Sequence, residues 1–189
     1  MSFLQFFVWG AWLITIGTYC INAKGWTFSE FGSIFSTLAI SSIFMPALTG
    51  IIADKYINAE KLYGALHILY GLVLLYVPSV DDPNMLFYVI LSAMIFYMPT
   101  ISLSNSIAYN VLKNNNFDVL KTFPPIRVWG TIGFIMAMWT TNLSGSKDNA
   151  NQFYIASVFA IILGIYSFSL PKCPPQKLIS ENATLTEKL

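Results

Sequence analysis

Residues 123–139 read FPPIRVWGTIGFIMAMW, a long apolar run that contains a single charged residue, Arg127. An arginine side chain stays protonated in proteins, and near the centre of a membrane helix it costs at least about 2.5–3.5 kcal/mol unless it faces a partner or water. A helix that starts at Pro124 or Pro125 would let this side chain reach the membrane surface. A helix that starts near Asp118 would carry it roughly 13 Å into the span.

Arg127 has neighbours that favour the deeper position. Thr131 and Phe134 follow it at offsets of four and seven residues, so guanidinium, hydroxyl and ring share one helix face. Such a face suits contact with a small polar solute. An arginine that only reaches for the membrane surface does not need a hydroxyl and an aromatic ring on the same face. Gly130 and Gly133 lie on other ridges and would let neighbouring helices approach closely. We interpret Arg127, Thr131 and Phe134 as a candidate solute site, with a membrane-surface anchor as the alternative.

The composition around this stretch places the chain in a lipid bilayer. Hydrophobic residues make up 56% of the 189 residues and charged residues only 10%, whereas soluble domains carry about 25% charged residues. Polar interruptions divide the chain into six apolar segments, each long enough to cross a hydrocarbon core of about 30 Å. The sequence therefore predicts an all-α membrane protein with six transmembrane helices. They cover residues 3–21, 31–53, 62–77, 85 to about 109, a part of 119–141, and 153–170.

Several classes of function are disfavoured by what the sequence contains. The net charge of +1 gives no basic surface for a nucleic acid. Cys20 and Cys173 are isolated from histidine and from each other, so we predict no disulfide framework, no metal site and no cofactor. His67 is the only histidine and its span holds no carboxylate, which argues against an intramembrane enzyme. We expect His67 to be neutral and hydrogen-bonded to a neighbouring helix, with a proton relay as the alternative.

The lysines predict the orientation of the chain. Membrane proteins concentrate Lys and Arg in their cytoplasmic connections. The lysines here gather in the even-numbered connections and the C-terminal tail, so we expect both termini to be cytoplasmic. Those lysines are Lys55, Lys61, Lys113, Lys121, Lys172, Lys177 and Lys188, against Lys24 and Lys147 on the other side.

The fourth segment carries a second polar face. Ser102, Asn105, Ser106 and Tyr109 are spaced for one side of a helix, after a Pro99 that can interrupt it. Polar side chains within a membrane turn toward the protein interior or a cavity. This face is therefore a second candidate for contact with a solute.

The first segment has an aromatic stripe made of Gln5, Trp9, Trp12 and Tyr19. Such a stripe could form the wall of a site for a planar, hydrogen-bonding solute. The alternative is that at least half of these side chains belong to the core.

The residues quoted so far also resemble a known family. FPPIRVWGTIGFIMAMW, with SFLQFFVWGAWL at residues 2–13, FMPALTGIIADK at 44–55 and YMPT at 97–100, closely resembles the nucleoside:proton symporters of the major facilitator superfamily. These are the nucleoside and xanthosine permeases of bacteria. The resemblance covers residues 1–171, and its fifth-span string is the most specific part.

One motif matches only in part. Gly50, Asp54 and Lys55 fit the superfamily loop signature G-x-x-x-D-[RK]-x-G-[RK]-[RK], but residues 57–59 read INA instead of supplying the later glycine and basic positions. That loop helps to gate the cytoplasmic side in the superfamily. The resemblance thus implies a gating loop at Gly50, Asp54 and Lys55 whose role is weakened here.

The resemblance implies a fold of two six-helix bundles, each built from three-helix inverted repeats (3+3), with substrate held between them near the membrane midplane. Residues 1–171 then form the N-terminal six-helix bundle. Residues 172–189 form a cytoplasmic linker or tail, whose composition predicts disorder. The resemblance further implies that Arg127 and Thr131 hydrogen-bond the ribose or base of a nucleoside and that Phe134 packs against it.

The implied function is nucleoside transport in the bacterial cytoplasmic (inner) membrane, by proton-coupled import and alternating access. The partners are a nucleoside, the lipid bilayer, a proton as coupling ion and a C-terminal six-helix bundle. No acid lies deep in the six predicted spans, so proton coupling resides in residues outside this sequence, in His67 against expectation, or nowhere. Two alternatives stay open: an inert or structural truncated half-transporter, and a homodimeric major facilitator carrier for another small polar solute.

Overall fold

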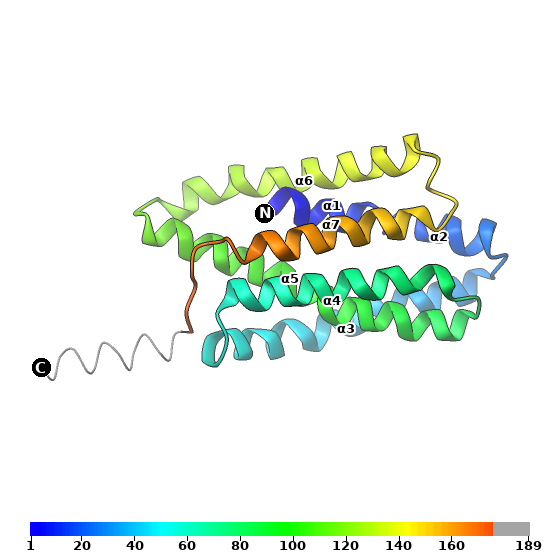
Figure 1. Cartoon of the computed structure of the whole chain (residues 1–189), viewed down its shortest axis with the longest axis horizontal. Helices are drawn as coiled ribbons and strands as arrows, with labels where there is room; N and C mark the ends of the chain where they lie inside the picture. The colour runs from blue at the N-terminus through cyan, green and yellow to red at the C-terminus, as the bar shows by residue number, and fades with distance from the viewer. Residues whose placement is uncertain (176–189) are drawn as a thin grey trace, which may run out of the picture.

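The computed structural model describes residues 1–175, and these residues form a bundle of helices with no strand among them (Figure 1). The long helices run side by side along the long axis of the molecule and alternate in direction. The elements are α1 (Ser2–Gly10), α2 (Ile16–Thr18), the π-helical turn η1 (Tyr19–Ala23), α3 (Phe28–Lys55), α4 (Ala59–Tyr76), the 3-10 turn η2 (Val77–Ser79), α5 (Pro83–Asn114), α6 (Val119–Leu143) and α7 (Asn151–Ser167).

Three of these helices are long and apolar enough to cross a membrane by length and composition, and a shorter apolar one follows. The long ones cover Phe28–Lys55, Ala59–Ser79 and Pro83–Asn114, and the shorter one is Asn151–Ser167. Helices of this kind are suited to a membrane, because a helix satisfies its own backbone hydrogen bonds in lipid. The predicted count of six spans stays a prediction.

The first predicted span is not one continuous helix, which corrects the expectation for residues 3–21. It breaks after α1 into turns at residues 11–15, then continues as α2 and the π-turn η1. Side chains from the end of α6 and the start of α7 contact the irregular stretch. The Thr141 hydroxyl donates to the Ala11 backbone carbonyl at 2.9 Å, and the Thr15 hydroxyl donates to the side-chain amide oxygen of Gln152 at 2.7 Å. Such bonds allow an irregular backbone within an apolar bundle.

Prolines lie inside three helices without ending them. The possible interruption at Pro99 does not occur, because α5 runs through it to Asn114. Pro46 likewise lies inside α3, and Pro124 and Pro125 lie inside α6. Each proline lacks the backbone N–H that would bond the carbonyl four residues earlier, so each leaves a free acceptor in its helix.

Small residues set the closest helix contacts. A Cβ on Gly133 of α6 would meet the backbone carbonyl oxygen of Phe3, and one on Gly10 of α1 would come within 2.7 Å of the Phe134 carbonyl oxygen. The predicted close approach at Gly133 is therefore confirmed. Gly71 plays the same part between α4 and α7, where its carbonyl accepts the Ser157 hydroxyl at 2.7 Å. Association in lipid relies on such close packing, because lipid removes the hydrophobic drive between helices.

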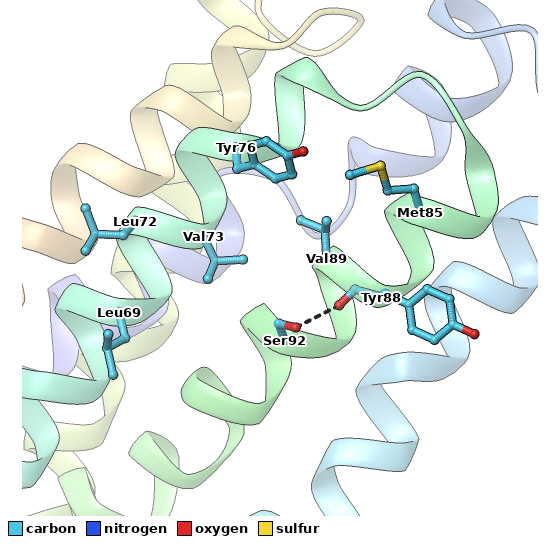
Figure 2. Close-up of a pocket in the computed structure, with 8 residues that line it drawn as sticks. All are labelled: Leu69, Leu72, Val73, Tyr76, Met85, Tyr88, Val89 and Ser92. Carbon is cyan, nitrogen blue, oxygen red and sulfur yellow. Dashed lines mark hydrogen bonds between the residues drawn. The ribbon is translucent and has the colours of Figure 1, made fainter.

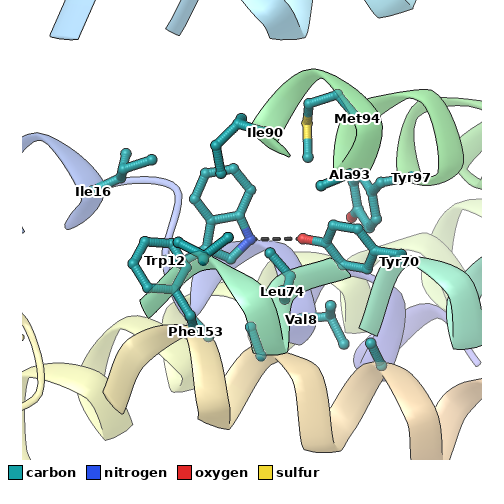
Figure 3. Close-up of a cluster of buried hydrophobic side chains, with 14 of the residues drawn as sticks. Val8, Trp12, Ile16, Tyr70, Leu74, Ile90, Ala93, Met94, Tyr97 and Phe153 are labelled. Carbon is teal, nitrogen blue, oxygen red and sulfur yellow. Dashed lines mark hydrogen bonds between the residues drawn. The ribbon is translucent and has the colours of Figure 1, made fainter. Parts of the chain in front are cut away.

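The core lies where α1, α4, α5 and α7 meet, and it is rich in aromatic rings (Figure 3). Trp12 is fully buried in it, and its indole N–H donates to the Tyr70 hydroxyl at 2.6 Å. Tyr19 is also buried there, with its ring 5.3 Å from that of Phe153. Trp12 and Tyr19 are therefore core residues, which corrects their candidacy for a solute-facing wall.

A short segment after α7 folds back onto the start of α4. The Cys173 N–H donates to the Glu60 carboxylate at 2.9 Å, and the Ala59 N–H donates to the Cys173 carbonyl at 3.1 Å. Glu60 and Cys173 are both buried. Residues 172–175, the start of the predicted tail, therefore pack on the bundle. The remainder of that tail, 176–189, lies outside the described residues.

Candidate functional site

Helix α6 begins early enough to carry Arg127 well into the bundle. Asp118 caps its start by accepting the Leu120 N–H at 3.0 Å and the Lys121 N–H at 3.4 Å. Arg127 lies eight residues after Val119, which is about 12 Å along the helix axis. Of the two helix starts that the sequence left open, the structure has the one near Asp118.

The guanidinium of Arg127 rests on an aromatic ring from α1. Its central carbon lies 3.9 Å from the centre of the Phe6 ring, a cation–π contact. Gly130 makes room for this contact, since a Cβ there would come within 2.6 Å of the Phe6 ring and 2.7 Å of the guanidinium. The predicted close approach at Gly130 is thus confirmed. Phe6 covers one face of the guanidinium, whose N–H groups donate to no other residue among those that the structure describes.

The three predicted site residues come together around one hollow. Arg127, Thr131 and Phe134 line a cavity of about 350 Å³ with Phe6 and Gly130. A neighbouring hollow of about 320 Å³ shares Arg127 and Thr131 and reaches toward Phe123. The shared face predicted from the spacing is present. That these residues contact a substrate stays a prediction.

An aromatic wall stands behind this hollow. The Trp9 ring packs edge-on against Phe134 at 6.4 Å and lies 5.6 Å from the Tyr97 ring. The Trp9 indole N–H is buried and has no hydrogen-bond partner among the described residues. Trp9 is thus the one member of the predicted first-span stripe that lies against the candidate site.

The hollow is lined by one positively charged residue, Arg127, and by no acidic residue among those that the structure describes. No carboxylate of residues 1–175 lies within ion-pair distance of Arg127, since the ion pairs there join Lys24 to Asp81 and Lys121 to Asp118. A guanidinium carries five N–H donors and no acceptor. With aromatic faces beside it, this hollow is suited to a planar solute that presents carbonyl or other acceptor groups.

His67 belongs to a buried polar network instead of the hollow. Its Nε2 lies 2.8 Å from the Gln5 side-chain oxygen, which also accepts the Tyr63 hydroxyl at 2.6 Å. The Gln5 amide nitrogen donates to Thr100 at 2.8 Å. Because an amide oxygen only accepts, His67 donates through Nε2, and its Nδ1 is left without a described partner. The predicted hydrogen bond from His67 to a neighbouring helix is confirmed, and Gln5 is a core residue.

The polar face of the fourth segment lies on α5 and borders a hollow of about 280 Å³ between α5 and α3. Ser102 and Asn105 line it opposite Ser42 and Pro46. One turn further along α5, the Tyr109 ring packs against Phe123 of α6 at 4.5 Å. The polar face identified in the sequence therefore borders a second hollow at Ser102 and Asn105 and contacts α6 at Tyr109.

The predicted gating residues lie in helix α3, and the connection that follows is only three residues long. Asp54 and Lys55 form the end of α3 and are exposed. Gly50 lies one turn earlier, and a Cβ there would meet nothing within 4 Å. Lys55 suits the C-terminal end of the helix dipole. The gating role of these residues stays a prediction.

A further hollow, of about 500 Å³, lies between α4 and α5 and differs in chemistry (Figure 2). Its lining is apolar and aromatic apart from Ser92, whose hydroxyl donates to the Tyr88 carbonyl at 2.9 Å. It offers no charge and no free amide to a polar solute. Size alone therefore does not make it a candidate for solute binding.

Phe6 is the site residue that the sequence did not identify. It stands in the run FLQFFVWG, where the four aromatic residues Phe3, Phe6, Phe7 and Trp9 share one broad half of a short helix. Nothing in that spacing distinguishes the ring that meets Arg127. Which ring meets Arg127 depends on the packing of α1 against α6, which the spacing within one segment does not encode.

Comparison with known proteins identifies a family whose sequences this chain matches. A family model described as "Nucleoside H+ symporter" matches residues 1–188. The xanthosine permease of Escherichia coli K12 is 46% identical over 174 residues, which is 92% of this chain and 42% of the permease. The nucleoside permease NupG of the same organism is 42% identical over 177 residues, which is 94% of this chain and 42% of NupG.

The fold is similar to that of a solved transporter. A crystal structure of a mutant of the nucleoside transporter NupG superposes with a TM-score of 0.91 at 43% identity, over 93% of this chain and 44% of that one. A second NupG crystal structure gives a TM-score of 0.88, also at 43% identity, over 92% of this chain and 43% of that one. The chain spans about two fifths of the length of the relatives it matches.

Proposed function

Because this chain belongs to the nucleoside H⁺ symporter family, which consists of transporters and not enzymes, we propose that it forms the N-terminal half of a proton-coupled nucleoside importer. The hollow lined by Arg127, Thr131 and Phe134 carries the proposal. In it, Arg127 and Thr131 hydrogen-bond the base or ribose, and Phe134 packs against the solute. The N–H groups of Arg127 have no hydrogen-bond partner in residues 1–175 and lie beside aromatic rings, which supports a planar, acceptor-rich substrate such as a nucleobase.

We propose that residues 1–171 form six spans related as two inverted three-helix repeats. The helix contacts support this arrangement, with residues 2–23 counted as the first span. The first span packs on the fifth (α6) as the second (α3) packs on the fourth (α5). The third (α4) packs on the sixth (α7). A two-fold axis that exchanges spans one to three with spans four to six turns the first–fifth pair into the fourth–second pair and leaves the third–sixth pair unchanged, so this set of pairs is consistent with it.

A second six-helix bundle completes the proposed transporter. Helices α3 and α6 bury only five and four of their residues, so each has a broad face for another bundle or for lipid. Alternating access would then be rocking of the two bundles around the hollow. Gly50, Asp54 and Lys55 would contribute a weakened gate at one end. Since no carboxylate of residues 1–175 lines the hollow, the proton-coupling acid is expected in the second bundle.

The proposed location is the bacterial inner membrane, with both termini cytoplasmic. The lysines support this orientation. Lys55 and Lys61 flank the α3–α4 connection, and Lys113 and Lys121 flank the α5–α6 connection, which places all four at one end of the bundle.

The test is uptake and binding of a radiolabelled nucleoside panel by this chain in membranes, alone and together with the C-terminal bundle of a related permease. Activity that needs both parts and is lost in Arg127→Ala supports the proposal. Lys121→Ala is the matched control, because Lys121 is a cation on the same helix that does not line the hollow. Full activity of the Arg127→Ala pair would contradict the proposed site.

Two other results would point to the alternatives. Uptake by this chain alone, with a dimer detected, would favour a homodimeric carrier. No binding under any condition, by a chain that is folded in the membrane, would favour an inert half.

A further inference from the structure

We propose that the hollow between α3 and α5 is a second subsite of the same cavity, and that it holds the hydroxyl groups of the nucleoside sugar. This inference rests on the function proposed above and names the part of the substrate that the second subsite recognises. Its lining residues are Ser42, Pro46, Met98, Ile101, Ser102 and Asn105.

The two hollows lie at the same depth in the bundle. The Tyr109 ring on α5 meets the Phe123 ring on α6 at 4.5 Å, close to the α5–α6 connection. Asn105 lies four residues before Tyr109, and Arg127 lies four residues after Phe123. Because the two helices are antiparallel, both steps lead away from that connection by about 6 Å. Asn105 and Arg127 therefore lie at the same depth along the bundle axis, both about one turn from the Tyr109–Phe123 contact.

The two groups also face the same side. Residues four apart on a helix share a face, so Asn105 lies on the Tyr109 side of α5 and Arg127 on the Phe123 side of α6. Phe123 and Arg127 line one hollow together. The Tyr109–Phe123 contact therefore joins the α5 face that carries Asn105 to the α6 face that carries Arg127.

The chemistry of the second hollow fits hydroxyl groups. The Asn105 side chain has no hydrogen bond to any described residue, which leaves two donors and an acceptor available. The hydroxyls of Ser42 and Ser102 already donate to the carbonyls of Leu38 and Pro99, at 2.5 and 2.8 Å, so they offer lone pairs. Pro46 has no N–H, which leaves the Ser42 carbonyl as another acceptor. A hydroxyl both donates and accepts, and this lining offers both kinds of partner.

The two subsites divide the nucleoside by chemistry. Arg127 donates only, beside the rings of Phe6 and Phe134, so its hollow takes the planar base with its acceptor groups. The mixed donors and acceptors around Asn105 take the sugar. A nucleoside bound in this way lies across the α5–α6 face with its two ends at one depth.

The experiment measures binding of uridine and inosine, each with its 2′-, 3′- and 5′-deoxy analogues, to the two-part transporter described above. Asn105→Ala is expected to weaken binding of both parent nucleosides about 3- to 10-fold, the loss of one or two hydrogen bonds. The variant should weaken one deoxy analogue much less, because that analogue already lacks the hydroxyl that Asn105 binds. Asn110→Ala is the matched control, since its side chain already pairs with Asn114 at 2.8 Å and does not line the hollow.

An equal loss for the parents and all analogues, or no difference between Asn105→Ala and Asn110→Ala, would overturn the sugar subsite while leaving the proposed function intact. Nucleoside binding that is absent in the unmodified pair would overturn both. Since the Asn105 amide pairs with no described residue, Asn105→Ala should reach the membrane in normal amounts. Ser102→Ala tests the same hollow through an acceptor and should give a smaller loss with the same dependence on the analogue.

Discussion

Arg127 and Phe6 form the closest link between charge and aromatic surface in the candidate site, with the guanidinium carbon 3.9 Å from the ring centre. The ring is buried and comes from α1, whereas the arginine comes from α6. A guanidinium over a ring face can still direct N–H groups away from the ring. The contact thus orients the donors that the proposed substrate needs.

Phe6→Leu tests this orientation. Leucine keeps most of the apolar volume but removes the ring, so the cation–π contact of about 0.5–2 kcal/mol is lost. Nucleoside binding by the two-part transporter is expected to weaken about 2- to 30-fold, with normal membrane abundance. Phe117→Leu, at a 57% exposed position between α5 and α6, is the control and should bind normally. Unchanged binding by Phe6→Leu would show that Arg127 needs no support from the ring.

Gly133→Ala should destabilise the bundle by separating α1 from α6. The new methyl group would meet the Phe3 backbone, which cannot move as a side-chain end can. Overpacking of this kind costs typically about 1–3 kcal/mol. Thermal unfolding in detergent, followed by tryptophan fluorescence, measures the effect.

Gly32→Ala on α3 is the matched comparison for Gly133→Ala. A Cβ at Gly32 meets nothing within 4 Å, and alanine favours a helix over glycine by about 1 kcal/mol. The midpoint temperature of thermal unfolding of Gly32→Ala should equal that of the unmodified chain or exceed it. If both variants unfold at the same temperature, the close contact does not limit stability.

Gln5→Leu should cost more stability than Tyr63→Phe. Leucine at position 5 would leave the His67 Nε2 and the Tyr63 hydroxyl without their acceptor and would remove the donor to Thr100, whose hydroxyl keeps its bond to the Tyr97 carbonyl. Phenylalanine at position 63 leaves the Gln5 oxygen paired with His67. Each orphaned buried group costs about 1–3 kcal/mol. The same unfolding measurement ranks the two variants, and the reverse order would contradict the network.

Cys173 should react slowly with N-ethylmaleimide at pH 8. Burial, and then the nearby Glu60 charge, raise the pKa of its thiol to about 11, so at pH 8 the reactive thiolate is scarce. Glu60→Ala removes the acceptor of the Cys173 N–H and should speed the labelling at least about tenfold. Peptide mapping follows each thiol separately. Cys20 is fully buried in the core and should stay unlabelled in both proteins; rapid labelling of Cys173 in the unmodified chain would show that this segment does not stay packed.

The sequence by itself determined the membrane setting and the face shared by Arg127, Thr131 and Phe134. Both follow from local rules, because hydrophobic run length and helical spacing do not depend on distant residues. The close approach at Gly130 and Gly133 also followed, since small residues admit it in any membrane bundle. The resemblance in residues 123–139 identified the family for the same reason, as a pattern within one segment.

The tertiary structure decided how distant segments meet. It selected Phe6 from four aromatic residues, because only that ring lies beneath Arg127. It moved Gln5 and Trp12 into the core, through partners 95 and 58 residues away. It broke the first span at a point where Thr141, 130 residues further along, bonds the Ala11 carbonyl. Asn105 and Arg127 came level only through the Tyr109–Phe123 contact, because helix spacing fixes a face but not its neighbour.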